Sequence, residues 1–432
     1  MNSLPNELLD ATFAHFVASG GSDDRQDAVT LSNICLASRR LCHIAQPLLY
    51  RSIEIDVRSN QPQLLLATLK TRPELATAIK ELFLECAATD GPTPTELGYR
   101  IRQFLEDVFP TLKGLRILRS NHRVCTTKLV ESVLYKPGSG YHMSIPTDLS
   151  NLQSLELFAD YYVFKYHFIL RLPQLRRVVM HSTKILNLLD EDRVLPNDWG
   201  WSSQSIKELV LRLSSRTGMG RESLISNTLQ ALSRSLPCLE CLRIEHHGTV
   251  LDPWEMRYLT AVFTPQLELT LRRLAIVDGQ IDTCYPTFVN SIHSNDESAI
   301  YKIQTSKLEY LSIDWHTLFI GPEDPACGAC SLTTLRHLTL RYVELYASDA
   351  PELNPRFLLE YVQLRFPFLK RLDLELRSHR PVDHKVLRLY STTFTSAGII
   401  FNVREHSSIT PWTSVRRTGC ITSSGRPSTL SP

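Results

Sequence analysis

Residues 366–374 of the chain are FPFLKRLDL, where a proline is followed by leucines in the order Leu-x-x-Leu-x-Leu. The last two leucines are two positions apart, so in an extended strand they point to the same face of a sheet. The proline ends a preceding helix and directs the chain into extended geometry. This stretch therefore predicts a buried strand that follows a helix.

The same aliphatic-x-x-aliphatic-x-aliphatic pattern recurs ten times, and the units follow one another at a mean spacing of about 32 residues. Helical stretches are predicted between them at 96–109, 221–236, 254–263 and 356–366. Such a repeat predicts a solenoid in which each unit adds one strand. The ten triplets are Ile79-Leu82-Leu84, Leu112-Leu115-Ile117, Leu152-Leu155-Leu157, Leu175-Val178-Met180, Ile206-Leu209-Leu211, Leu239-Leu242-Ile244, Leu271-Leu274-Ile276, Leu308-Leu311-Ile313, Leu335-Leu338-Leu340 and Leu369-Leu372-Leu374.

The repeating helix-Pro-x-Leu-x-x-Leu-x-Leu unit resembles the leucine-rich repeat. The resemblance implies an α/β fold over residues 62–380, with a curved parallel sheet and outer helices. The family places Asn or Cys eight residues after the first leucine, and none of the ten units has either residue there. We therefore expect an irregular solenoid. An ordinary α/β domain with leucine-rich strands is the alternative.

Composition limits the class of protein. The 432 residues carry a net charge of +2, with 43% hydrophobic and 21% charged residues, which is typical of a globular protein and not of a nucleic-acid binder. No apolar run approaches the roughly 18 residues that a membrane span requires, and the first residues lack the pattern of a signal peptide. Ten scattered cysteines indicate free thiols in a reducing compartment. We expect a cytoplasmic or nuclear protein without membrane or nucleic-acid partners.

The end of the chain differs in composition from the rest. Only one of the 67 leucines, Leu430, follows residue 390, and residues 391–432 hold 17 Ser or Thr against a single acidic residue. This composition predicts a flexible tail over residues 391–432, in which the apolar run at 399–401 could dock on the body.

The first 55 residues do not follow the repeat. One apolar stripe includes Leu8, Leu9 and Phe13, and a second one includes Leu31 and Leu48. Two or three short helices can hardly form a core that is stable alone. We therefore expect this segment to need a partner, which is either the repeat array that it caps or another protein.

Three segments here are similar to the F-box: residues 4–9 (LPNELL), 31–41 (LSNICLASRRL) and 48–51 (LLYR). The stretch 45–53 (AQPLLYRSI) is similar to that of many fungal F-box proteins. The resemblance implies docking on the Skp-type linker and, through it, on a cullin-based SCF ubiquitin ligase. By correspondence with the family, the linker-binding residues are Leu4, Pro5, Leu8, Leu9, Ile34 and Leu41.

Few residues suggest chemistry. The pairs Cys238-x-x-Cys241 and Cys327-x-x-Cys330 are far too distant in sequence for a zinc finger, although the second pair lies in a predicted loop and is the better thiol site. The sequence has no phosphate loop, nucleophile elbow or His-Glu-x-x-His motif. We therefore expect no catalytic residues, metal or cofactor. An enzyme that uses the Cys327 loop is a minor alternative.

The predicted concave face carries interleaved charges of both signs, which favours a protein or peptide target of mixed charge. Arg116, Glu156 and Asp373 are expected there, and six further residues are the candidates for target binding. The prediction is a non-catalytic substrate-recognition subunit of an SCF-type ubiquitin ligase, and the main alternative is a repeat scaffold without a ligase role. The six candidates are Arg212, Arg243, Glu245, Asp314, Arg341 and Glu375.

Overall fold

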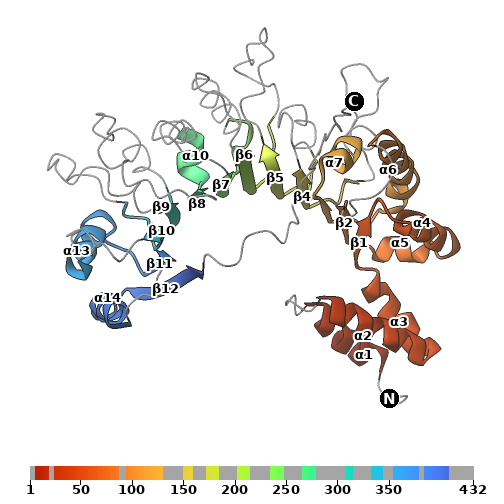
Figure 1. Cartoon of the computed structure of the whole chain (residues 1–432), viewed down its shortest axis with the longest axis horizontal. Coiled ribbons are helices and arrows are strands. Elements are labelled where there is room, and N and C mark those ends of the chain that lie inside the picture. The colour runs from red at the N-terminus through yellow and green to blue at the C-terminus, as the bar shows by residue number, and fades with distance from the viewer. Residues whose placement is uncertain are drawn as a thin grey trace, which may run out of the picture.

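The protein has an α/β fold in which three helices precede a curved parallel sheet of twelve strands (Figure 1). The sheet forms an arch, and its helices lie on the outer side. The computed structural model describes residues 5–18, 24–86, 94–129, 149–158, 172–183, 202–214, 234–247, 265–278, 307–314, 332–343, 354–378 and 384–407.

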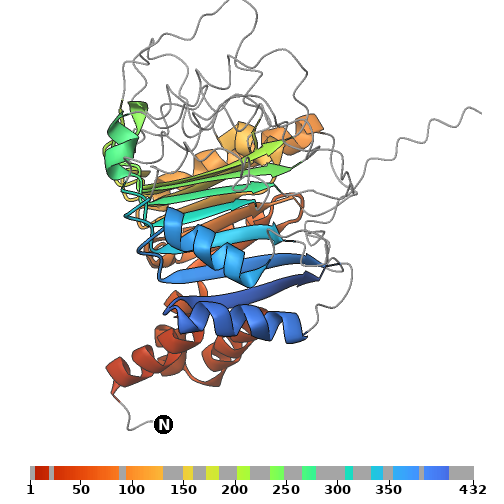
Figure 2. The same cartoon turned by 90° about the vertical axis from the view of Figure 1, so that its left-hand side faces the viewer.

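The strands follow one another in sequence order across the sheet, and every pair is parallel. Figure 2 shows them stacked with their axes nearly aligned. Their bounds are β1 Ser52–Asp56, β2 Glu81–Glu85, β3 Ile117–Ser120, β4 Ser154–Phe158, β5 Arg177–Thr183, β6 Glu208–Ser214, β7 Cys241–His247, β8 Arg273–Asp278, β9 Tyr310–Asp314, β10 His337–Val343, β11 Arg371–Ser378 and β12 Ile400–Ser407.

Where the structure describes most of the segment between two strands, that segment contains a helix. Two of them, α6 and α13, confirm the predicted helices at 96–109 and 356–366, whereas the predictions for 221–236 and 254–263 fall almost entirely outside the described residues. The helices of the array are α4 Gln61–Thr71, α5 Glu74–Ala78, α6 Pro94–Val108, the 3-10 turn η1 Phe109–Thr111, α7 Arg123–Leu129, α10 Pro265–Thr270, α13 Pro355–Arg365 and α14 His384–Ser396.

A backbone ladder joins the repeats just before the strands begin. The carbonyl of Lys80 accepts the N–H groups of both Arg116 and Ile117, at 2.8 and 2.9 Å. The same double acceptance recurs from unit to unit, for example at Gln153, Lys207 and Arg272 in the following repeats. Each repeat is thus fixed to its neighbour by the main chain, and this link tolerates variation of the side chains.

The second and fourth positions of the strands form the core. Leu82, Leu155, Leu338 and Leu372 represent the second position, and all are at most 1% exposed. The buried cluster is continuous from Ile55 in β1 to residue 399 before β12. Apolar burial of this extent is the main stabilising term of such an array.

The sheet extends beyond the predicted limits at both ends. β1 begins at Ser52, so the array does not start near residue 62, and α14 and β12 occupy residues that were assigned to the flexible tail. The tail prediction is therefore wrong for residues 391–407, because Phe394 and Ile399 are buried in the core. The rest of the predicted tail lies outside the described residues.

The predicted register of the second unit is wrong by three residues. Leu82 of β2 pairs with Leu118, so the aliphatic triplet is not Leu112-Leu115-Ile117, and the fourth strand position is Ser120. This serine is fully buried, and its hydroxyl accepts a hydrogen bond from Thr126 at 3.0 Å. Arg116 consequently lies before the strand and not on its inner face, where Arg119 takes the expected place.

The turn before β3 requires a glycine. A Cβ atom on Gly114 would lie 2.7 Å from the carbonyl oxygen of Thr77, which is a backbone atom that cannot move aside. The preceding repeat therefore approaches this turn more closely than a side chain would permit.

Candidate interaction surfaces

Three helices form a separate unit at the amino end: α1 Asn6–Ala18, α2 Asp24–Ala37 and α3 Arg39–Leu49. Among the described side chains of this unit, Leu9, Phe13, Leu31 and Ala45 form a buried core. Partly buried residues such as Ile34 and Leu41 pack against this core. Leu8, Val29 and Leu36 of the same unit remain exposed, and exposed apolar surface of this kind favours docking on another surface.

Two contacts set the geometry of this unit. The hydroxyl of Ser38 accepts the N–H of Leu41 at 3.1 Å and so caps α3 directly after α2 ends. The guanidinium of Arg72, at the end of α4, donates a hydrogen bond to the side chain of Gln46 in α3. The helical unit is thereby connected to the first helix of the array as well as to β1.

The predicted linker-binding residues differ in exposure. Pro5 and Leu8 are exposed, and Leu8 retains 55% of its accessible surface. Leu9 is 3% exposed and holds α1 in the core of the unit, so it has no free surface for a partner. Ile34 and Leu41 are partly buried against the same core, and Leu4 lies outside the described residues.

Two further apolar residues of this unit are exposed and were not identified from the sequence. Leu36 is 83% exposed and Val29 is 59% exposed. They are seven positions apart in α2, which places them on one face of the helix, two turns apart. The F-box resemblance assigned no role to either residue, and only their position opposite the buried Leu31 could have indicated them.

The inner face of the arch is formed by the first, third and fifth positions of the strands. Across β3 to β7 these positions hold a continuous chain of ion pairs and hydrogen bonds. Arg119 pairs with Glu156 at 3.7 Å, and the Glu156 carboxylate contacts His181 at 2.5 Å. Arg212 contacts Nδ1 of His181 at 2.9 Å and Glu245 at 2.7 Å.

The contacts of His181 define its tautomer. Arginine only donates, so Nδ1 of His181 accepts from Arg212 and the proton of the neutral ring lies on Nε2. That N–H then donates to Glu156. The hydrogen bond from His181 lowers the pKa of Glu156 against the effect of burial, and the charges of Arg119 and Arg212 add to the lowering.

A second network occupies β10 to β12. Asp373 is almost fully buried and accepts hydrogen bonds from Arg371 at 2.8 Å, His337 at 2.8 Å and Asn402 at 2.9 Å. Burial acts to raise the pKa of Asp373, but these three donors outweigh it and hold the pKa below its ordinary value. Beside it, Arg341 and Glu375 form an ion pair at 2.9 Å.

The structure describes the ion pairs of five of the six predicted target-binding residues, all except Asp314. Arg243 keeps 44% of its side chain exposed and pairs with Glu245, which is 7% exposed. Arg212 is 29% exposed, whereas Arg341 and Glu375 are only 14% exposed. Asp314 in β9 is the register partner of Arg341 in β10, and the structure does not describe the side chain of Asp314. Arg243 thus offers the most surface to a partner, and Glu245 mainly orients the two arginines.

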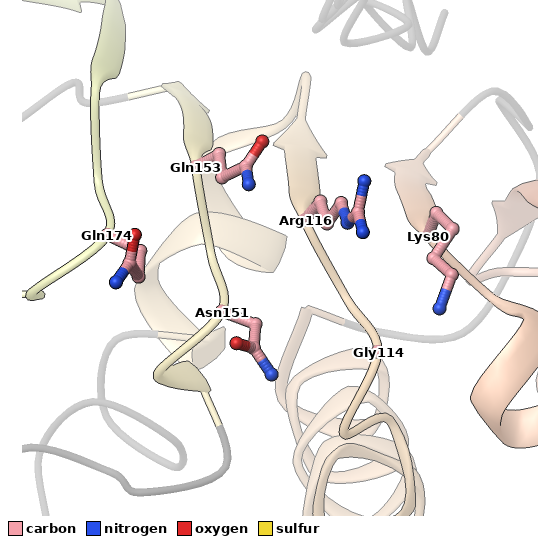
Figure 3. A pocket seen from close by; sticks show the side chains of 6 residues that line it. All are labelled: Lys80, Gly114, Arg116, Asn151, Gln153 and Gln174. Carbon is pink, nitrogen blue, oxygen red and sulfur yellow. The ribbon is translucent and has the colours of Figure 1, made fainter.

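A shallow pocket of about 210 Å³ opens at the amino ends of β2 to β5 (Figure 3). Lys80 Nζ donates to the carbonyl of Thr77 at 2.7 Å, and Asn151 Nδ2 donates to that of Lys113 at 2.9 Å. The lining contains two cations and three amides but no acid, so it suits a carboxylate or another small anion. The lining residues are Lys80, Gly114, Arg116, Asn151, Gln153 and Gln174.

The first of the two predicted cysteine pairs, Cys238 and Cys241, does not form a metal site in the described part of the chain. Cys238 contacts the side chain of Gln204, and Cys241 begins β7 on the inner face. Among the described residues, no three His, Cys, Asp or Glu side chains gather closely enough to bind a metal ion. Cys327 and Cys330 lie outside the described residues.

In the part of the chain that the structure describes, no helix has the length and apolar character needed to cross a membrane. No protein-family model matches the chain, and no curated protein matches it either.

Proposed function

We propose that the protein is a non-catalytic substrate-recognition subunit of an SCF-type ubiquitin ligase, in which the amino-terminal helices are an F-box and the array is a leucine-rich-repeat receptor. The observation that carries the proposal is the pairing of two features. The helical unit exposes Leu8 and Leu36 within the F-box-like segments, and it is attached directly to a repeat sheet.

The helical unit supplies the docking part of this proposal. Leu8 and Leu36 together expose apolar surface on the helical unit. Burying a leucine contributes roughly 1.5–3 kcal/mol, so two such residues account for a substantial share of a specific interface. The partner would be the Skp-type linker and, through it, the cullin.

The inner face supplies the target-binding part. Its charges are of both signs, and the Glu156 and Asp373 networks hold them in fixed positions. A preorganised face of this kind selects a partner by charge complementarity and loses little side-chain entropy on binding. The target would be a protein whose lysines are brought close to a conjugating enzyme elsewhere in the complex, so the mechanism is proximity.

Binding of the purified full-length chain to the Skp-type linker tests the proposal. We expect Leu8→Asp and Leu36→Asp each to weaken the affinity about tenfold or more, since each replaces buried apolar area by a charge. The matched control is Leu64→Asp, which makes the same change at a 58% exposed leucine in α4 of the array. Far-UV circular dichroism and the thermal midpoint would verify that each variant remains folded.

The outcomes separate the two candidate functions. Tight binding that is lost in the two amino-terminal variants and kept in Leu64→Asp supports the adaptor. If the folded wild-type chain does not bind the linker, the adaptor proposal fails. The helices would then be a cap for the first repeat, as solenoids require, and the protein would be a repeat scaffold.

A further inference from the structure

Four side chains that neither proposed surface uses meet at the carboxyl ends of β1 to β3. Cys86 directly follows β2 and is partly buried against the core of the array. Cys125 lies in α7 and is fully buried. His122 comes from the turn between β3 and α7, and Arg58 follows β1. The fold therefore brings together two thiols, an imidazole and a guanidinium from three successive repeats.

Hydrogen bonds direct this cluster toward the sulfur of Cys86. The Cys125 thiol and the His122 ring both hydrogen-bond to Cys86, and the charge of Arg58 acts on the same sulfur. Nδ1 of His122 accepts the backbone N–H of Val124 at 3.2 Å, so in the neutral ring the proton is on Nε2. The Nε2–H of His122 is therefore the donor that is available to Cys86, and the hydrogen bond to the backbone of α7 holds the ring in this orientation.

The environment shifts the pKa values of the two thiols in opposite directions. The hydrogen bond from Cys125 lowers the pKa of Cys86 most, burial opposes this effect, and His122 and Arg58 lower the pKa further, to about 5. The pKa of Cys125 is raised by its hydrogen bond to Cys86 and by burial. The lowered pKa favours the thiolate of Cys86 beside the protonated thiol of the more deeply buried Cys125, which is the arrangement of a nucleophile and a resolving partner.

We propose that Cys86 and Cys125 form a peroxide-reactive dithiol site that closes reversibly to an intramolecular disulfide. The Cys86 thiolate attacks one oxygen of hydrogen peroxide, the O–O bond breaks, and the departing hydroxide takes up a proton to give water, which leaves Cys86 as a sulfenic acid. Cys125 then loses its proton and attacks that sulfur, which releases a second water. In sum, two thiols and one hydrogen peroxide give one disulfide and two waters. The sulfurs lose two electrons and the peroxide gains them.

The chain contains a matched control for this reaction. Cys35 in α2 and Cys42 in α3 are also hydrogen-bonded to each other. There the pKa of Cys35 is raised, first by burial and then by Cys42, and no histidine or arginine contributes to the shift. Proximity of two thiols is common to both pairs, whereas activation by His122 and Arg58 is confined to the first.

Alkylation of the full chain with iodoacetamide tests the activation. Peptide mass spectrometry would follow each cysteine between pH 4 and pH 9. We expect half-maximal labelling of Cys86 near pH 5, and labelling of Cys35 only above the range of an ordinary thiol, about 8.5. His122→Asn keeps an acceptor for the backbone of α7 but removes the donor to Cys86, so it should raise the labelling midpoint. A Cys86 midpoint at or above that of an ordinary thiol overturns the proposal.

Mild oxidation tests the disulfide. The wild-type chain would be treated with hydrogen peroxide, blocked with N-ethylmaleimide and mapped without reduction. We expect a linked peptide pair that joins Cys86 and Cys125, that is lost after dithiothreitol, and that forms before any link between Cys35 and Cys42. In Cys125→Ser, a folded variant should accumulate Cys86 sulfenic acid that dimedone traps. Absence of the linked pair in the wild type, or equal rates for both thiol pairs, refutes the proposal without need of a variant.

Discussion

The helical unit and the repeat array solve the problem of burial in different ways. The helical unit has a fully buried core of Leu9, Phe13, Leu31 and Ala45. The array instead continues one core from Ile55 to residue 399, and every repeat shares it with its neighbours. Repetition thus lets short units become stable together. A small unit at the end of such an array must take support from its attachment, and its leftover apolar surface is available to a partner.

The largest effect is expected where the continuous core is broken. Leu155 in β4 is fully buried between two repeats, and Leu155→Ala should lower the free energy of unfolding by about 2–5 kcal/mol. The measurement is chemical denaturation of the full chain, followed by circular dichroism.

The matched change in the other region is Leu9→Ala, since Leu9 is nearly as buried. Hydrogen exchange should show protection lost in residues 6–49 only, with the array unchanged, because the two cores are separate. Loss of protection throughout the array in Leu9→Ala would contradict this separation.

The next effect concerns the close approach of two repeats. Gly114→Ala places a Cβ 2.7 Å from the carbonyl of Thr77 and should lower the free energy of unfolding by about 1–3 kcal/mol. Gly98→Ala in α6 is the control, because its Cβ meets only the flexible end of Lys128 and alanine favours the helix. Thermal unfolding of both variants gives the comparison, and equal midpoints would refute the steric argument.

A smaller effect is expected at the junction of α2 and α3. Ser38→Ala removes the cap of α3 and should cost about 1 kcal/mol, confined to the helical unit. Ser32→Ala, at an exposed position of α2, should change the unfolding free energy little. Hydrogen exchange of the α3 amides distinguishes the two, and it would argue against the capping role if both variants behaved alike.

The smallest effect at neutral pH is expected on the inner face. The pKa of Glu156 is lowered in the folded chain, so its contribution is present above the unfolded pKa of about 4.3 and is lost as the pH falls through the folded pKa. Glu156→Gln should cost less than about 1 kcal/mol at pH 7. It should also reduce the loss of stability between about pH 5 and pH 3.

The comparison for Glu156→Gln is Glu106→Gln, at an exposed carboxylate of α6 that pairs with Arg102. Urea unfolding at each pH gives the two profiles. A Glu156→Gln profile with the same acid slope as the wild type would show that the His181 contact adds nothing to stability.

The repeat strands were predictable because a two-residue period with leucine is unambiguous where it is complete. The prediction of strands from this period failed where other residues occupy the leucine positions. In the second unit Ser120 satisfies its hydroxyl by bonding to Thr126, a contact that no linear pattern reveals. At the last strand, Gly398 replaces the first aliphatic residue and adopts a φ of 77° to end α14, so β12 had no complete motif.

The candidate surfaces were predictable in location but not in exposure. Except for Leu4, which is not described, the predicted linker-binding residues lie in the helical unit. Leu9 is nevertheless buried and Leu36 is exposed, because the rotation of each helix about its axis depends on packing. The Glu156–His181 and Arg212–Glu245 contacts of the inner face join residues 25 and 33 positions apart, which only the strand register could reveal. The Cys86 cluster was missed for the same reason.

The ladder of shared carbonyls has a mechanical consequence. Each strand is hydrogen-bonded only to the strands next to it in sequence, so no hydrogen bond within the sheet joins its first strand to its last. A force that pulls the termini apart would therefore load each ladder step in series, and the array would peel from an end one repeat after another. A force–extension curve would then show a series of small, similar steps, each of which corresponds to the unfolding of one repeat. The central repeats would unfold last.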